Sequence, residues 1–104
     1  GTVIGAGFAS EMVGFISYRY FFDNGPEIAR TLDGGKTWAR LELDIPEEYA
    51  QYNMQPQNPT FSGNDGNYPI ILLDKDGNDR TMTLHTHDGG MTWIWPKLSA
   101  VDVS

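Results

Sequence analysis

The chain has 104 residues, of which 39% are apolar and 12% aromatic, so its composition fits one small folded domain and excludes a disordered segment. Seven basic and fourteen acidic residues give a net charge of −7, which argues against binding nucleic acid or docking on an anionic membrane. The sequence has no cysteine for disulfides or thiol chemistry, and no apolar run approaches the length of a membrane span.

The first part of the chain reads as four short strands separated by turns. Each run is rich in aromatic and β-branched residues, which favour strands, and an Asn-Gly-Pro sequence at residues 24–26 supplies a turn signal. The second run continues into further aromatic residues, and alternation places Tyr18 and Tyr20 on one face of it. The expected strands cover residues 8–10, 13–18, 28–30 and 38–43.

A proline-rich link follows, and we assign residues 44–58 to it as a connecting loop. The link is long for a compact domain, so we expect it to run along the surface. Proline at position 46 with acidic residues behind it predicts a single helical turn within residues 46–52. No longer segment of the sequence has helical periodicity.

The second part of the chain repeats the first. Its expected strands cover residues 61–62, 68–73, 82–85 and 93–98, and an Asp-Gly-Asn turn signal separates the middle two. The run 68–73 is continuously apolar, as expected of a strand that is buried on both faces. The sequence therefore predicts an all-β fold with two four-stranded antiparallel meander sheets in one domain, the first over residues 2–43 and the second over residues 59–99.

One eight-residue motif lies between the third and fourth expected strands of each copy. It has the form Thr-x-Asp-Gly-Gly-x-Thr-Trp, and its two occurrences lie 55 residues apart with six of eight positions identical. The aspartates can accept hydrogen bonds from turn amides, the glycines supply backbone angles that other residues avoid, and the tryptophan rings can pack against the sheet. The two variable positions differ in chemistry between the copies, which fits a structural role for the motif. The motif residues are Thr31, Asp33, Gly34, Gly35, Thr37 and Trp38 in the first copy, and Thr86, Asp88, Gly89, Gly90, Thr92 and Trp93 in the second.

This motif resembles the Asp-box, or bacterial neuraminidase repeat, and the pattern ahead of it is similar to repeat proteins whose β-propeller blades carry one box each. The family includes sialidases, other glycosidases, sorting receptors and photosystem assembly factors. In these proteins the box joins the outer two strands of a blade, away from the central channel. The resemblance therefore implies two consecutive propeller blades, and it leaves the function open.

Catalysis by this chain alone is not expected. A sialidase needs an arginine cluster, a tyrosine nucleophile with a carboxylate partner, and an acid. The Phe/Tyr-Arg-Ile-Pro motif that normally carries the family's arginine is absent from this sequence. Arg30 directly precedes the first motif, where we expect it to have a role at the blade edge. We also expect no cofactor.

Three further groups of residues could contact a ligand. His85 and His87 share one strand face but lack a recognisable third metal ligand, so we expect an exposed pair near a turn. Residues 74–79 group oxygen ligands around a glycine without the spacing of a calcium loop, so we expect an acidic hairpin turn and no metal. Tyr18, Tyr20 and Trp95 could stack on a ligand, although packing between sheets is the commoner use of such residues.

Two blades by themselves leave apolar sheet faces open. The chain can be part of a longer propeller, can assemble with copies of itself into a closed ring, or can close its two sheets face to face. Of these we expect self-association. The function that we favour is a non-catalytic module for binding or assembly, with a glycan or protein ligand, in an extracellular or cell-surface protein of a bacterium. The alternatives are a glycosidase-like propeller whose catalytic residues lie outside this chain and a purely structural spacer.

Overall fold

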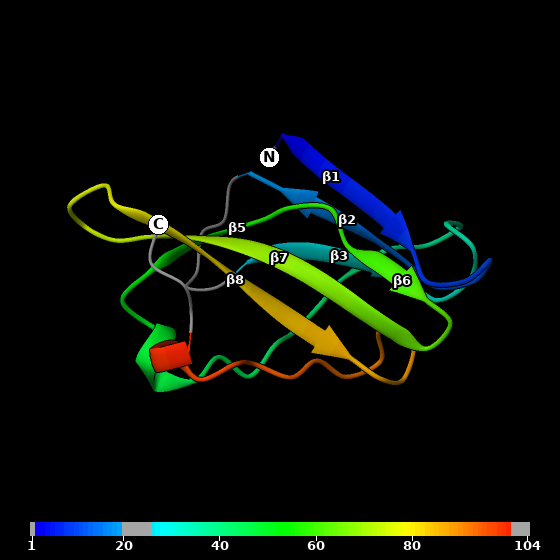
Figure 1. The fold of residues 1–104 in the computed structure, drawn as a ribbon. Coiled ribbons are helices and arrows are strands. Elements are labelled where there is room, and N and C mark those ends of the chain that lie inside the picture. The colour runs from blue at the N-terminus through cyan, green and yellow to red at the C-terminus, as the bar shows by residue number, and fades with distance from the viewer. Residues whose placement is uncertain (1, 20–25, 101–104) are drawn as a thin grey trace.

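The computed structural model describes residues 2–19 and 26–100, which form two four-stranded antiparallel sheets (Figure 1). The first sheet is a meander whose strands lie side by side in chain order. The predicted all-β class and the pair of antiparallel sheets are therefore confirmed. The strands of the first sheet are β1 (Val3–Phe8), β2 (Gly14–Tyr18), β3 (Glu27–Thr31) and β4 (Ala39–Arg40).

The second sheet is organised around one long strand, β7. The strand β8 pairs along the whole of one edge of β7, whereas β5 and β6 pair one after the other along its opposite edge. Together β5 and β6 take the place that β1 has in the first sheet. The break between them coincides with a proline at position 59, which has no amide hydrogen to give to a sheet. The bounds are β5 (Asn53–Pro56), β6 (Thr60–Ser62), β7 (Asp65–Leu73) and β8 (Asp79–Thr86).

The structure corrects the connecting loop that we expected over residues 44–58. A 3-10 turn, η1 (Glu47–Tyr49), does lie within the expected helical turn, but the second sheet already begins at Asn53. Met54 and Pro56 are buried while the residues between them are not, which is the alternation of a half-buried strand. The second half of the expected loop is therefore an edge strand.

Both fourth strands are shorter than expected. The strand β4 covers only two of the residues 38–43, and within residues 93–98 only Ile94 makes a sheet-like bridge, to His85. The run 68–73 also differs from the expectation of burial on both faces. Its alternate members Tyr68, Ile70 and Leu72 are buried, and the residues between them are half-buried because no described element covers that face.

The described part of the chain ends in a second 3-10 turn, η2 (Leu98–Ala100), which lies beside η1 (Figure 1). The backbone amide of Leu98 donates a hydrogen bond to the carboxylate of Glu48 at 2.5 Å, which ties the two turns together. Neither turn, nor any other helix in residues 2–19 and 26–100, has the length and apolar character that crossing a membrane requires.

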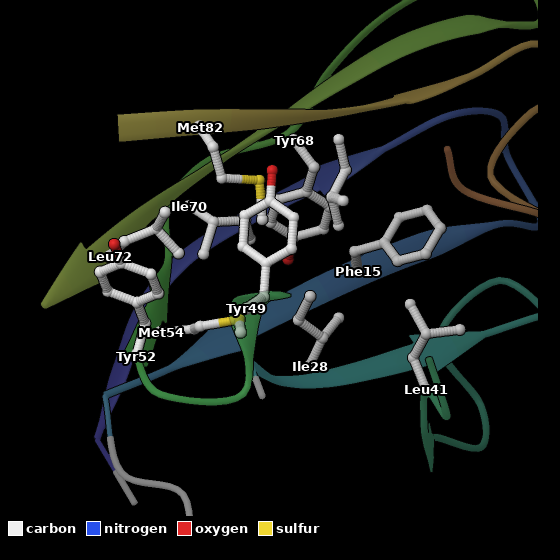
Figure 2. Close-up of a cluster of buried hydrophobic side chains, with 11 residues drawn as sticks. Phe15, Ile28, Leu41, Tyr49, Tyr52, Met54, Tyr68, Ile70, Leu72 and Met82 are labelled. Atoms are coloured by element: carbon white, nitrogen blue, oxygen red, sulfur yellow. The ribbon is translucent and has the colours of Figure 1, made fainter. Parts of the chain in front are cut away.

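The two sheets pack against each other around a single cluster of buried side chains (Figure 2). Tyr49, from the segment between the sheets, lies in the middle of this cluster. The backbones approach closely at Gly5, where a Cβ atom would lie 2.7 Å from the carbonyl oxygen of Gln57. The buried hydrophobic residues are Phe15, Ile28, Leu41, Tyr49, Tyr52, Met54, Tyr68, Ile70, Leu72, Met82 and Leu84.

Candidate functional site

The first Thr-x-Asp-Gly-Gly-x-Thr-Trp motif forms a turn that is closed by its own side chains. The carboxylate of Asp33 accepts hydrogen bonds from the Thr37 hydroxyl at 2.6 Å, the Thr37 amide at 2.9 Å and the Thr31 hydroxyl at 2.8 Å. The Thr31 oxygen in turn accepts from the Gly35 amide at 2.9 Å. Gly34 and Gly35 have φ angles of 75° and 94°, a region that side chains with a Cβ avoid. The Thr37 hydroxyl and amide bonds lower the pKa of Asp33 to about 2.

The second motif repeats this geometry. The carboxylate of Asp88 accepts from the Thr92 hydroxyl at 2.5 Å, the Thr92 amide at 2.9 Å and the Thr86 hydroxyl at 2.8 Å. The bond from the Thr92 hydroxyl is the main reason that the pKa of Asp88 lies well below its usual range. Both aspartates are thus held ionised by hydrogen bonds within their own turns. A carboxylate in this state is a poor general acid, and its hydrogen bonds hold the motif turn together.

The two motif tryptophans differ in their surroundings. Trp93 is half-buried and packs against rings of both sheets, whereas Trp38 is 36% exposed. The indole nitrogen of Trp38 donates to the Gly35 carbonyl at 3.1 Å, while the buried indole nitrogen of Trp93 has no acceptor among the described residues. The expected packing of the Trp38 ring against the sheet is therefore only partial, because no other sheet covers it.

A groove with a volume of about 370 Å³ lies at the boundary between the two sheets. Arg30, on β3, spans this boundary, because its guanidinium donates to the carbonyl of Met91 in the second motif at 3.4 Å. Trp93 and Trp95 supply aromatic surface, and buried Leu41 also lines the groove. The remaining lining residues are Arg40, Glu42, Leu43, Asp44 and Thr92.

One of the two groove arginines is paired with a residue outside the groove. Arg40 lies 3.5 Å from the carboxylate of Glu27, and this pair is more than a quarter exposed on both sides. Arg30 and Arg40 also line a second hollow of about 300 Å³ on the Trp38 side of β4. An exposed ion pair is worth little, on the order of 0–1 kcal/mol, so a ligand carboxylate can compete for Arg40. Guanidinium groups bind carboxylates with two parallel hydrogen bonds, and the indole rings favour apolar side chains.

The aromatic residues singled out in the sequence do not form one site. Trp95 lies in the groove and packs on the ring of Tyr49, with ring centroids 5.0 Å apart. Tyr18 is half-buried at the end of β2 and does not line the groove, and Tyr20 lies outside the described residues. The sequence did not single out Arg30 and Arg40 as residues of one groove. The signal that could have found Arg30 is its place directly before the motif, two residues after Ile28 and so on the same strand face as a buried residue.

The histidines and the acidic turn are engaged locally. The Nδ1 atom of His85 lies 2.7 Å from the amide oxygen of Asn67, and that of His87 lies 2.9 Å from the carboxylate of Asp65. Within residues 2–19 and 26–100 no three potential metal ligands of the His, Cys, Asp or Glu type come together. The carboxylate of Asp74 accepts from turn amides, and the bond from the Asn78 amide is the main cause that lowers its pKa.

Comparison with known proteins supports the fold. No family model matches the chain, and no curated protein matches it. Among solved structures, one of YCF48 bound to a D1 peptide is similar over 93% of this chain, with 24% sequence identity and a TM-score of 0.58. The chain covers 27% of that β-propeller protein, so it corresponds to about a quarter of its length. At this level of identity the similarity shows a propeller-like arrangement of the two sheets.

Proposed function

We propose that this chain is a non-catalytic Asp-box repeat module that binds a protein partner through a peptide carrying a carboxylate. The observation that carries the proposal is the groove between the sheets, in which Arg30 and Arg40 lie with Trp93 and Trp95. The arginines suit a carboxylate and the indole rings suit an apolar side chain beside it. The similar structure of YCF48, which is bound to a peptide, supports a peptide as the kind of ligand.

The turn chemistry supports the Asp-box assignment and the absence of catalysis. Each motif aspartate uses its carboxylate to hold its own turn together, and these hydrogen bonds make it a poor acid and a weak base. A glycosidase would need a pair of carboxylates held apart across a sugar-binding cleft. We further propose an extracellular or cell-surface setting in a bacterium, which follows only from the Asp-box resemblance.

The overall charge, with Glu42 and Asp44 in the groove itself, leaves Arg30 and Arg40 as the groups there that attract an acidic segment. The chain carries a net charge of −7, so an acidic partner is repelled by most of the molecule at long range. The arginines must therefore act at short range, where paired hydrogen bonds fix the orientation of the carboxylate. Salt screens the exposed contacts and the long-range repulsion alike. The arginine-dependent part of the affinity, measured as the ratio of binding by the unchanged chain to binding by Arg30→Gln/Arg40→Gln, should therefore fall as salt concentration rises.

The test uses a panel of synthetic hexapeptides in which acidic and apolar residues are combined, with binding followed by tryptophan fluorescence. The double variant Arg30→Gln/Arg40→Gln should bind the best peptide about 10-fold to 100-fold more weakly, since a hydrogen bond to a charged group contributes about 1.5–3 kcal/mol. Arg19→Gln is the matched control, because Arg19 is exposed and lies outside the groove. Equal loss in both variants would contradict the proposed site. Binding on a glycan array without any peptide binding would favour a glycan module, and no binding in either assay would favour a spacer.

A further inference from the structure

The interface between the two sheets is centred on one aromatic side chain. Phe15 of β2 projects from the first sheet onto a pocket of the second sheet and is fully buried. Its ring stacks on Phe61 with centroids 5.7 Å apart and meets Trp93 edge to face at 5.5 Å. A Cβ atom on Gly90 would lie 2.5 Å from the Phe15 ring, so the glycine of the second motif makes room for it. Phe61 itself lies over Gly66, where a Cβ would meet its ring at 2.4 Å.

The first sheet carries the same pocket with nothing in it from the described residues. Phe8 is paired with Gly14 in the same way as Phe61 with Gly66, and its ring lies over that glycine. Phe8 meets Trp38 edge to face at 6.2 Å, as Phe61 meets Trp93 at 6.0 Å. The four corresponding residues are Phe8, Gly14, Gly35 and Trp38 on the first sheet, and Phe61, Gly66, Gly90 and Trp93 on the second.

The open pocket contains two of the seven large hydrophobic side chains that are exposed among the described residues. Phe8 is 50% exposed and Trp38 is 36% exposed, whereas their counterparts on the second sheet are covered by Phe15. A Cβ atom on Gly35 would meet only the Trp38 ring, at 3.8 Å, so the space that Phe15 occupies above Gly90 is free above Gly35. The first sheet thus has an open pocket like the one on the second sheet that Phe15 fills.

A second copy of this chain does not offer the matching half. In the first sheet Phe15 pairs with Arg30 across neighbouring strands. The corresponding pair in the second sheet is Asn67 with His85, so Asn67 takes the place of Phe15 and His85 that of Arg30. Asn67 and His85 are exposed and bonded to each other at 2.7 Å. A ring of identical copies would press this polar pair into the aromatic pocket, which would cost the desolvation of both side chains.

We infer that the pocket of Phe8, Gly14, Gly35 and Trp38 docks a further sheet of this repeat type that carries an aromatic side chain where Phe15 stands in the first sheet. The complete interface argues for an arginine as well, since Arg30 beside Phe15 reaches the Met91 carbonyl of the next motif. Lys36 is the residue of the first motif that corresponds to Met91, so its carbonyl is the acceptor that such an arginine would reach. None of the four pocket residues lines the peptide groove, although Trp38 shares the adjoining hollow with Arg30 and Arg40. The inference goes beyond the proposed function without depending on it.

The test places a second copy of residues 2–53 directly ahead of Gly1 in the full chain. In the native chain 46 residues separate Phe15 from Phe61, the ring on which it stacks. After this join the same number of residues separates the added Phe15 from the resident Phe8. The added copy carries Trp38→Phe, so that after labelling with 5-fluorotryptophan every fluorine signal comes from one of the three tryptophans of the original chain. In fluorine NMR the solvent isotope shift of Trp38 should fall to the level of Trp93. The same shift in the unextended chain should remain that of an exposed ring.

Two matched variants decide whether docking uses the pocket. Phe15→Asn in the added copy alone, which copies the second sheet's residue, should restore the exposed signal of Trp38. Phe8→Ala in the resident sheet of the tandem chain should give Trp38 the same isotope shift as Phe8→Ala in the unextended chain, since docking needs the Phe8 ring. Unchanged exposure of Trp38 in the tandem chain would overturn the inference. Concentration-dependent dimerisation of the unextended chain that Phe8→Ala abolishes would also overturn it, because the occupant would then be a second copy.

Discussion

Replacing Phe15 with alanine should be far more destabilising than replacing Phe8, although the two phenylalanines lie on the same sheet. Phe15 is 0% exposed and its ring contacts three other rings with centroids 5.5–5.9 Å away. Loss of a fully buried phenylalanine costs about 3–5 kcal/mol, from lost transfer free energy and the cavity left behind. Phe8 is 50% exposed, so only about half of the ~1.5–3 kcal/mol of a fully buried side chain is at stake, roughly 1 kcal/mol.

Urea denaturation followed by tryptophan emission measures both free energies of unfolding. A domain of this kind has a total stability of about 5–15 kcal/mol, so Phe15→Ala should shift the midpoint strongly, whereas Phe8→Ala should shift it only about a third to a fifth as far. Similar losses for the two variants would refute the reasoning. That result would mean that the face carrying Phe8 is already covered in solution, or that the sheets do not pack through Phe15.

Two further predictions concern the motif turns. The folded-state pKa of Asp33 is about 2 and that of Asp88 is also lowered, so their stabilisation is present above the unfolded-state pKa of about 3.9 and is lost as pH falls through the folded-state values. The urea concentration at the unfolding midpoint should therefore fall as the pH is lowered from about 5 to about 2. It should fall less steeply with pH in Asp33→Asn/Asp88→Asn, and equal pH dependence of the two chains would contradict the role of the carboxylates. Gly90→Ala should unfold at lower temperature than Gly77→Ala, since both glycines have positive φ but only Gly90 faces the Phe15 ring, and equal midpoints would show that this contact adds no constraint.

The sequence predicted the sheets and the turns because both depend on local chemistry. The doubled Thr-x-Asp-Gly-Gly-x-Thr-Trp motif fixes each hairpin from within, through hydrogen bonds between neighbours in the chain. The strand β5 was missed because Pro56 and a nearby proline resemble a loop, although Met54 and Pro56 alternate with polar residues. A proline is tolerated there because β5 lies at a sheet edge.

The groove could not be predicted in the same way, because it depends on how the two sheets meet. Arg30 lines the groove because its guanidinium donates to the carbonyl of Met91, which lies 61 residues further along the chain. Trp38 and Trp93 occupy equivalent motif positions, yet one is exposed and the other is covered by Phe15 of the neighbouring sheet. Local pattern gives the same expectation for both, so tertiary packing alone separates them.

Calorimetric titration of one peptide in two forms tests the central claim most directly. The peptide is the best binder of the hexapeptide panel, prepared once with its carboxylates free and once with every carboxyl group converted to an amide. If the arginines of the groove recognise a carboxylate, the free form should bind and the amidated form should bind about 10-fold to 100-fold more weakly, with the difference lost in Arg30→Gln/Arg40→Gln. Equal binding of the two forms by the unchanged chain would contradict the account.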